Sequence, residues 1–318
     1  MKKLYTNRAL AALYRDKIDE LNWKITQDPE QADIVSFKTR GMLSNLETIE
    51  NAKTIWGIPK AYHLVAKQNM WFYLRRFYGL KKAEYISPKT YILKSEEDKK
   101  ELIAALEKGN KVILKTNQQR RKGLQIVDSI SELEQKLSSE HVIGQILKTT
   151  TLKFKNRHFH LRFYVSLCIN FGELSGWVHP KSRVVFSKAR PNNSHEEFIT
   201  SNDYFSEELP LFGFELVGKK LLSLNTFFRV QKLLRIAIKP FIQVLTSELK
   251  PQKGYFDLFG IDIIFLENQY PLLVEINRLP SMNTLNKKDE ILKKEIISTF
   301  LNAIDQNKPD LKGWTQFF

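Results

Sequence analysis

The chain has 318 residues, of which 42% are hydrophobic, a formal net charge of +15 and one cysteine, Cys168. A single cysteine excludes an intrachain disulfide framework, and no run approaches the roughly 18 uninterrupted apolar residues of a membrane span. We therefore expect a globular, cytoplasmic protein of two or so domains. The excess of lysine and arginine predicts an acidic partner, which could be nucleic acid, a phosphate-rich ligand or an acidic polypeptide.

The first part of the chain, residues 1–66, is predicted to be a small α/β unit. Short apolar runs predict strands at 2–6, 32–37 and 53–56, and apolar residues at helical spacing predict a helix over 8–21. This unit has no glycine-rich phosphate loop, so we assign it no nucleotide.

Two helices are predicted next. Residues 61–78 carry an apolar stripe that includes Trp71 and Leu74, which favours one helix over the whole range. A charged helix is predicted over 96–107, and Gly109 is well placed to end it.

A strand, a basic loop and a returning strand follow at 111–116, 117–123 and 124–127. Lys115 comes at the end of the first strand, where a lysine can reach phosphates while the loop folds over them. This pattern suits triphosphate binding, and an ordinary basic hairpin is the alternative.

The strand predicted over 157–167 places His158, His160 and Arg162 on one face, because alternate side chains of a strand point the same way. Histidines with ordinary pKa values titrate near neutral pH. Basic residues are frequent and acidic ones scarce from Lys148 to Arg190, which we interpret as a binding surface.

The remaining elements are an apolar strand, a strand pair, two amphipathic helices and an aromatic tail. They are predicted at 141–147, 172–186, 221–249, 286–303 and 314–318. The helix over 221–249 is poor in acids, and Pro240 should kink or break it. The tail should pack back on the core.

The most informative stretch runs from Tyr255 to Asn283, where two apolar runs flank a polar turn. A turn centred between Asn268 and Gln269 places Asp262 opposite Glu275, and Asn277 lies on the same face as Glu275. Opposed like charges destabilise a sheet unless a cation lies between them. These three oxygen donors suit magnesium. An edge hairpin with one solvated face is the alternative.

The segments FDLFGID, VEIN and RLPS in this stretch resemble the end of the ATP-grasp core in the tubulin–tyrosine ligase-like family. The resemblance extends as an ordered series of partial matches over residues 55–300. It implies that Asp262, Glu275 and Asn277 are the metal ligands.

The resemblance also implies the other site residues. Those expected to bind ATP are Lys67, Lys115, Gly123, Gln145 and Leu147. Those expected at the phosphoryl-transfer and substrate site are Arg162, Arg183, His158, His160, Thr200 and Asn202. His158 stands where the family has a lysine and His160 where it has an aspartate, which is the clearest departure from the pattern.

The fold implied is the ATP-grasp fold, of the α/β (α+β) class, with a small N-terminal α/β domain. We expect this N-terminal domain at 1–66, a central domain at 67–147, and a C-terminal domain with the metal and substrate site at 148–318. ATP would lie between the last two.

The activity implied is ATP-dependent ligation of a carboxylate to the amine of a free amino acid, with Mg²⁺. The expected substrate is an acidic polypeptide such as a tubulin tail, modified by tyrosination, glutamylation or glycylation and received by the basic stretch from Lys148 to Arg190. Such a substrate would associate the chain with the cytoskeleton. The alternatives are an ATP-grasp ligase for a small metabolite or peptide, and a non-catalytic basic binder of microtubules or, less favoured, nucleic acid.

Overall fold

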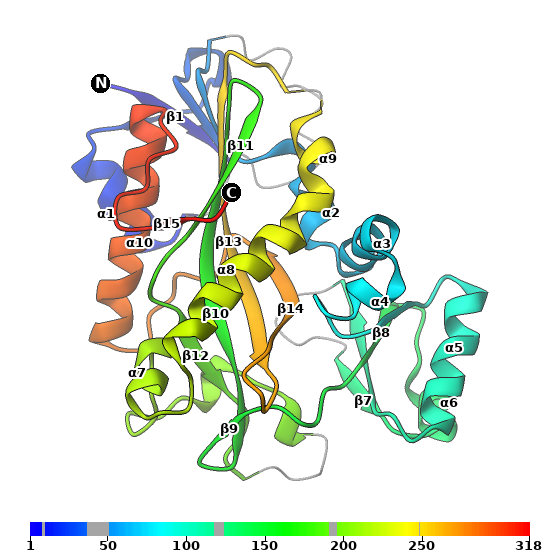
Figure 1. The fold of residues 1–318 in the computed structure, drawn as a ribbon. Helices are drawn as coiled ribbons and strands as arrows, with labels where there is room; N and C mark the ends of the chain where they lie inside the picture. Colours follow the sequence, from blue (N-terminus) through cyan, green and yellow to red (C-terminus); the bar gives the residue numbers. More distant parts are fainter. Residues whose placement is uncertain (8–9, 37–50, 118–123, 191–195, 248) are drawn as a thin grey trace.

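The computed structural model describes residues 1–7, 10–36, 51–117, 124–190, 196–247 and 249–318. Within these ranges the chain forms an 11-stranded sheet and a separate four-stranded sheet (Figure 1). Helices pack on both, so the architecture is mixed α/β, as expected. No helix in the described ranges combines the length and the apolar character needed to cross a membrane.

The N-terminal part contributes parallel strands to one end of the large sheet. Its elements are β1 (Lys3–Thr6), α1 (Ala12–Glu20), β2 (Lys24–Thr26), β3 (Ile34–Ser36) and β4 (Thr54–Trp56). Three strands and the helix match the predicted elements. Strand β2 was not predicted, because its three residues are not buried and carry no apolar pattern.

The predicted helix over 61–78 is interrupted. It consists of α2 (Tyr62–Val65) and α3 (Lys67–Tyr78), and α4 (Leu80–Ala83) follows. Ala66 has an extended ψ of 118°, which ends one helix and begins the next. The break makes Lys67 the first residue of α3, while Trp71 and Leu74 are buried as predicted.

The small sheet is antiparallel, in the order β5, β8, β6, β7. Its strands are β5 (Thr90–Ile92), β6 (Val112–Thr116), β7 (Gln125–Val127) and β8 (His141–Ile146). Helix α5 (Glu96–Glu107) connects β5 to β6, and α6 (Ile130–Lys136) connects β7 to β8. Helix α5 has the predicted bounds, because Ser95 caps its N-terminus by accepting from the Asp98 N–H and Gly109 follows its end with a φ of 75°.

The strands that the rest of the chain adds to the large sheet pair antiparallel with one another. They are β9 (Lys153–Phe154), β10 (Arg157–Asn170), β11 (Glu173–Val178), β12 (Arg183–Phe186), β13 (Gly254–Phe265), β14 (Pro271–Arg278) and β15 (Thr315–Gln316). Strand β13 also pairs in parallel with β4, so the N-terminal and C-terminal parts share one sheet. We propose domain boundaries at 66/67 and 147/148. With these boundaries, the first and the last domain contribute strands to the same sheet.

Helices cover both faces of the large sheet (Figure 1). They are α7 (Gly213–Gly218), α8 (Leu224–Ile238), α9 (Ile242–Thr246) and α10 (Lys287–Gln306). Buried residues of α8 and α10 belong to different core clusters, one on each side of the sheet. Pro240 breaks the predicted long helix at a 3₁₀ turn, and Trp314 and Phe317 are buried in the core, both as predicted.

The hairpin of β13 and β14 has the predicted pairing at its functional end. Asp262 lies opposite Glu275, and Gly260 lies opposite Asn277. Nearer the turn the register shifts by one residue, because Ile263 pairs with Leu273 and leaves Val274 as an extra residue on β14. The turn is therefore centred on Asn268 and not between Asn268 and Gln269 as predicted, and a β-bulge restores the predicted register at Asp262.

Candidate active site

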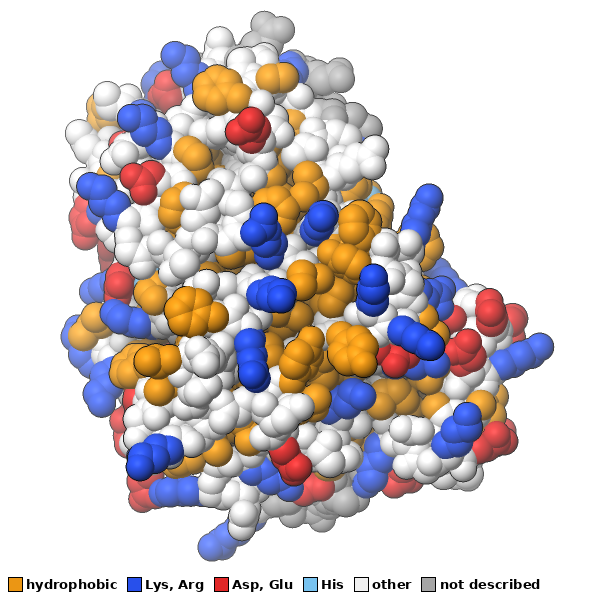
Figure 2. Space-filling view, in the orientation of Figure 1, with side chains coloured by type: hydrophobic (Ala, Val, Ile, Leu, Met, Phe, Trp, Pro, Cys, Tyr) orange, Lys and Arg blue, Asp and Glu red, His pale blue; other side chains and the backbone are white. Residues whose placement is uncertain are grey.

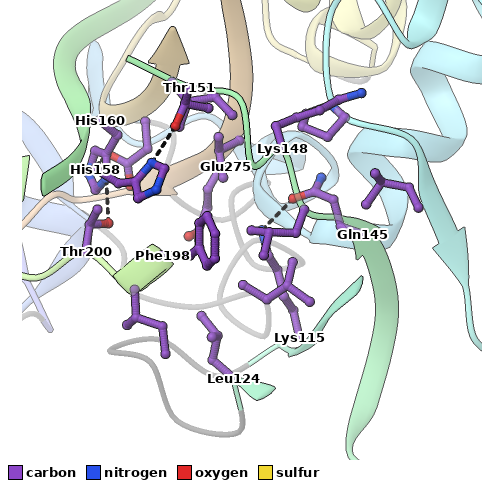
Figure 3. A pocket seen from close by; sticks show the side chains of 18 of the residues that line it. Lys115, Leu124, Gln145, Lys148, Thr151, His158, His160, Phe198, Thr200 and Glu275 are labelled. Carbon is purple, nitrogen blue, oxygen red and sulfur yellow. Dashed lines mark hydrogen bonds and ion pairs between the residues drawn. The ribbon is translucent and has the colours of Figure 1, made fainter. Parts of the chain in front are cut away.

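A cavity of about 250 Å³ lies between the two sheets, and Figure 3 shows its side chains from close by. Most of the predicted site residues converge on it. They are Lys67, Lys115, Gln145, Leu147, His158, His160, Arg162, Thr200, Asp262, Glu275 and Asn277. Gly123 and the basic loop around it lie outside the described residues.

The Asp262 carboxylate is held by a guanidinium. The Nε and Nη2 atoms of Arg162 donate to its two oxygens at 2.8 and 2.7 Å. The Asn277 amide donates to the same carboxylate at 3.4 Å. Burial alone would raise the pKa of Asp262, but the Arg162 guanidinium and the neighbouring His160 ring hold it well below its usual range. Asp262 is therefore an anion at neutral pH.

The Glu275 carboxylate has a separate cation. Its Oε1 atom lies 3.1 Å from the Nζ atom of Lys67. The two opposed carboxylates of the hairpin are each neutralised by their own basic side chain, which explains how the sheet tolerates them.

The oxygen donors of this hairpin fit magnesium in kind, because two carboxylates and an amide carbonyl are hard ligands on one face of one hairpin. No group of three or more His, Cys, Asp or Glu side chains in the described ranges could hold a metal ion. The candidate site therefore depends on the Asn277 amide as its third donor.

The opposite wall comes from the small sheet. The Nζ atom of Lys115 donates to Gln145 Oε1 at 2.7 Å (Figure 3). Gln145 Nε2 in turn donates to Thr90 Oγ1 at 2.9 Å. Burial lowers the pKa of Lys115 to about 8; Glu275 opposes this shift and Lys67 adds to it. Lys115 still carries its charge at neutral pH and faces the two acids, as a phosphate-binding lysine should.

The two histidines are each fixed by a threonine. His158 Nδ1 lies 2.7 Å from Thr151 Oγ1, and His160 Nδ1 lies 2.8 Å from Thr200 Oγ1 (Figure 3). The ring of Phe198 packs 4.6 Å from that of His158. Burial lowers the pKa of His158 to about 4, and the nearby charge of Lys153 adds to this shift, so the ring is neutral at pH 7. The expectation that this histidine titrates near neutral pH was therefore wrong.

The Nε2 atoms of these histidines are available for a ligand. Each is buried and has no hydrogen-bond partner among the described residues, although His160 Nε2 lies 3.4 Å from an Asp262 oxygen. Both rings line the cavity, so a bound molecule can supply the missing partners.

Comparison with known proteins agrees with this geometry. The model of the tubulin-tyrosine ligase family matches residues 47–207 and 188–312 of the chain. The chain belongs to the tubulin–tyrosine ligase family. Its mixed α/β structure, with a cavity between two sheets, is of the ATP-grasp type expected for this family.

Two curated relatives show how far the similarity extends. The "probable tubulin polyglutamylase ttll-9" of Caenorhabditis elegans is 27% identical over 170 residues, which cover 48% of this chain and 40% of that protein. The "probable tubulin polyglutamylase TTLL9" of Mus musculus is 26% identical over 194 residues, covering 56% of this chain and 42% of that protein. The matches thus span less than half the length of these relatives.

Two predicted residues of this tubulin–tyrosine ligase family member lie outside the cavity lining. Arg183 is 2% exposed, and its Nη2 atom donates to Asn202 Oδ1 at 2.9 Å. Its Nη1 atom lies 3.8 Å from Asp289, which in turn pairs with Lys293 at 2.6 Å. Arg183 stands opposite Arg162 in the β10–β12 ladder, so this buried network is adjacent to the active-site wall.

Several cavity residues were missed by sequence reasoning. Thr151 forms an isolated bridge with Leu266 and Phe198 ends a three-residue 3₁₀ helix, so neither belongs to an element with a periodic pattern, and both were identified only through the histidines that they contact. Lys148 also lines the cavity, and its place directly after Leu147 was the available signal.

The basic surface expected from Lys148 to Arg190 forms only in part: Lys153, Lys155 and Arg190 are exposed, whereas other basic residues of the stretch are not. Arg157 is 8% exposed and donates to the Ser187 and Tyr204 carbonyls, while Arg162 and Arg183 point inward. Two further lysines of the stretch are paired, Lys181 with Glu295 and Lys188 with Glu196. Much of its charge is therefore used inside the protein.

Proposed function

We propose that this chain is an ATP-dependent carboxylate–amine ligase that adds glutamate to an acidic protein tail of the tubulin kind. ATP would transfer its γ-phosphoryl group to a substrate carboxylate, giving an acyl phosphate and ADP. The amine of the free amino acid would then attack the acyl carbon, lose a proton, release phosphate and leave an amide bond.

The observation that carries this proposal is the meeting of opposite charges in one cavity. Asp262 and Glu275 come from the large sheet, and Lys115 faces them from the small sheet. Phosphoryl transfer depends mainly on positioning and on stabilising charge, and this arrangement offers both.

Each side chain has a role in this scheme. Asp262, Glu275 and Asn277 would hold Mg²⁺, which when bound offsets the negative charge of the phosphates. Lys115 would bind the α/β-phosphates, and the β8 segment with Gln145 and Leu147 would contact the nucleotide. Once magnesium neutralises Asp262, the Arg162 guanidinium would be available to the transferring phosphoryl group.

The substrate proposal rests on the curated relatives and on charge. Both relatives carry the name of a tubulin polyglutamylase, and the net charge of +15 suits an acidic polypeptide. We place the activity in the cytoplasm, at the cytoskeleton, because that is where such a substrate occurs.

The test is ADP release by the purified chain with Mg-ATP, an acidic tubulin-tail peptide and a mixture of amino acids, followed by mass spectrometry of the peptide. A peptide mass gain of one or more glutamates is expected, and an Asp262→Asn, Glu275→Gln double variant should abolish it. ATP turnover without peptide modification would instead indicate a ligase for a small substrate.

One observation favours a second candidate, a non-catalytic binding protein. Arg162 occupies both oxygens of Asp262, and His160 stands where the family has an acid. If this pairing persists in the presence of magnesium and ATP, the protein would bind its partner without turnover. Tight peptide binding with no ADP release would support this candidate.

A further inference from the structure

Two long segments of the chain contain no acidic residue. Residues 51–83 and 216–247 lack Asp and Glu entirely. Their basic residues are Lys53, Lys60, Lys67, Arg75, Arg76, Lys81, Lys82, Lys219, Lys220, Arg229, Lys232, Arg235 and Lys239. Segments of this length without an acid, in a chain with 35 acidic residues, are notable because the two meet in space.

The contact between them is direct. The Tyr78 hydroxyl at the end of α3 donates to the Ile236 carbonyl in α8 at 2.9 Å. The rings of Tyr73 in α3 and Phe241, just after α8, lie 4.9 Å apart. Helix α3 therefore packs against the end of α8, and α4 follows α3 directly in the chain (Figure 1).

Helix α8 presents its charges outward in a row. Arg229, Lys232, Arg235 and Lys239 are exposed, while Val230, Leu233, Leu234, Ala237 and Ile238 are buried. The row spans about 15 Å at the rise of an α-helix. None of the four forms an ion pair with an acidic side chain in the described part of the chain, and the Arg235 guanidinium lies over the ring of Phe318 at 5.9 Å.

Figure 2 shows the same face in space-filling form. Lys and Arg side chains cross its middle along α8 and continue toward α3 and α4, with hydrophobic side chains between them and few acidic ones. We define the basic face as the exposed side chains of Arg76, Lys81, Lys82, Arg229, Lys232, Arg235 and Lys239.

This face is separate from the cavity. Ile276 and Leu273 of β14 pack in the same core cluster as the buried side of α8, whereas Glu275 and Asn277 line the cavity. Because neighbouring side chains of a strand point to opposite sides of the sheet, α8 lies on the side away from the cavity.

We propose that the basic face docks an acidic segment of a polypeptide partner, at a distance from the residue that enters the cavity. Unpaired cations three or four residues apart on one helix are matched by carboxylates at the same spacing on an acidic helix. Exposed apolar residues at the start of α8, Leu224 at 71% and Phe228 at 67%, add the hydrophobic contact typical of a protein interface.

Nucleic acid and membrane fit the face less well. The apolar side of α8 is buried in the core, so it is not available for insertion into a bilayer. The exposed apolar residues at the start of α8 include the aliphatic Leu224, which cannot stack on a base, so we favour a polypeptide over nucleic acid, and the oligonucleotide arm of the test below separates the two.

The identity of the partner as the ligase substrate rests on the proposed function, but docking itself can be measured without turnover. The probe is a fluorescein-labelled polyglutamate peptide, titrated with the full chain at low and high salt. The test variant reverses the row: Arg229→Glu, Lys232→Glu, Arg235→Glu and Lys239→Glu. A matched control reverses four exposed lysines elsewhere, Lys24, Lys108, Lys308 and Lys312, and changes the net charge equally.

The row variant should bind the peptide about tenfold more weakly or worse, because several exposed ion pairs of modest strength are replaced by repulsion. The control should stay close to wild type. A milder variant with glutamine at the four row positions should give an intermediate loss, and far-UV circular dichroism should show the same helix content in all proteins.

Equal losses in the row variant and the control would overturn the proposal, since net charge alone would then explain binding. Row-dependent binding that is tighter for an oligonucleotide or for phosphatidylserine vesicles than for the peptide would overturn the choice of partner. The Asp262→Asn, Glu275→Gln variant separates the two proposals: it should keep row-dependent binding while losing turnover. Row-dependent binding without turnover in any protein would refute the ligase and leave the docking face standing.

Discussion

The Nζ atom of Lys67, the first residue of α3, lies 3.1 Å from Oε1 of Glu275 on β14. This ion pair joins a helix beside the small sheet to the hairpin of the large sheet that we propose binds the metal ion. Both side chains are mostly buried, at 12% and 26% exposed, so the pair is shielded from solvent. Together with the pair between Arg162 and Asp262, it balances the acids before any metal ion is bound.

Replacing Glu275 by glutamine should weaken magnesium binding and leave Lys67 without its anion. Loss of one anionic oxygen donor should cost at least as much as loss of a supporting contact, for which about 10–100-fold in metal affinity is typical. The measurement is the magnesium dependence of ADP release. Glu267→Gln, an equal change in the exposed turn of the same hairpin, is the control and should leave it unaltered.

ATP binding should weaken as the pH rises above about 8. The pKa of Lys115 is lowered to about 8 by burial, so its positive charge is present below that pH and is lost above it. If the charged form binds the phosphates, affinity should fall by up to about tenfold per pH unit beyond the pKa. Affinity measured at pH 7 and pH 9 tests this. A Lys115→Arg variant that keeps its charge should lose the pH dependence, and persistence of the same slope would contradict the assignment.

The His158 ring should stay neutral down to acidic pH. Its pKa is about 4 because the ring is buried and near Lys153, so protonation becomes significant only as the pH falls toward that value. The imidazole resonances of labelled protein, followed by NMR against pH, should show this midpoint, and a His158→Gln variant identifies the signal. A midpoint near the ordinary value of about 6.5 would show that the ring is open to solvent.

Arg183 should matter for stability as well as for activity. Removing it by Arg183→Ala takes away the donor to the Asn202 carbonyl and one of the two cations near the buried Asp289, which keeps Lys293, and we expect unfolding to require about 1–3 kcal/mol less. Chemical denaturation measures this change. Arg190→Ala, an exposed arginine in the same stretch, should shift it by no more than about 0.5 kcal/mol. Unchanged stability with lost ADP release would place the Arg183 guanidinium in the reaction itself.

Local sequence patterns predicted the elements whose stability is itself local. The bounds of α5 follow from Ser95 and Gly109, and the break at Pro240 follows from a missing N–H. The pairing of Asp262 with Glu275 was also readable, because a hairpin joins neighbours in the chain. The break at Ala66 was not predicted, since alanine favours helix and no local sequence signal marks an extended residue there.

Long-range relationships were beyond the sequence pattern. The pairing of β4 with β13 joins residues some 200 positions apart, and nothing local specifies it. The stretch from Lys148 to Arg190 was predicted to be a basic surface. Whether a basic side chain on a strand is exposed depends on what packs against that face of the sheet, and Arg157 and Arg183 are buried. The sequence did not predict the basic face of α8 and α3, because its two segments are far apart in the chain and meet only in the folded protein.

The extra residue on β14 has a consequence for what the cavity can accept. In a regular strand Val274 and Glu275 would point to opposite sides, but at the bulge both side chains line the cavity. A bound molecule therefore meets a hydrocarbon surface and a carboxylate one residue apart. Val274 can make an apolar contact with one part of a ligand while Glu275 makes a polar contact with the adjacent part. Consecutive residues of a regular strand cannot do this, because their side chains point to opposite sides of the sheet.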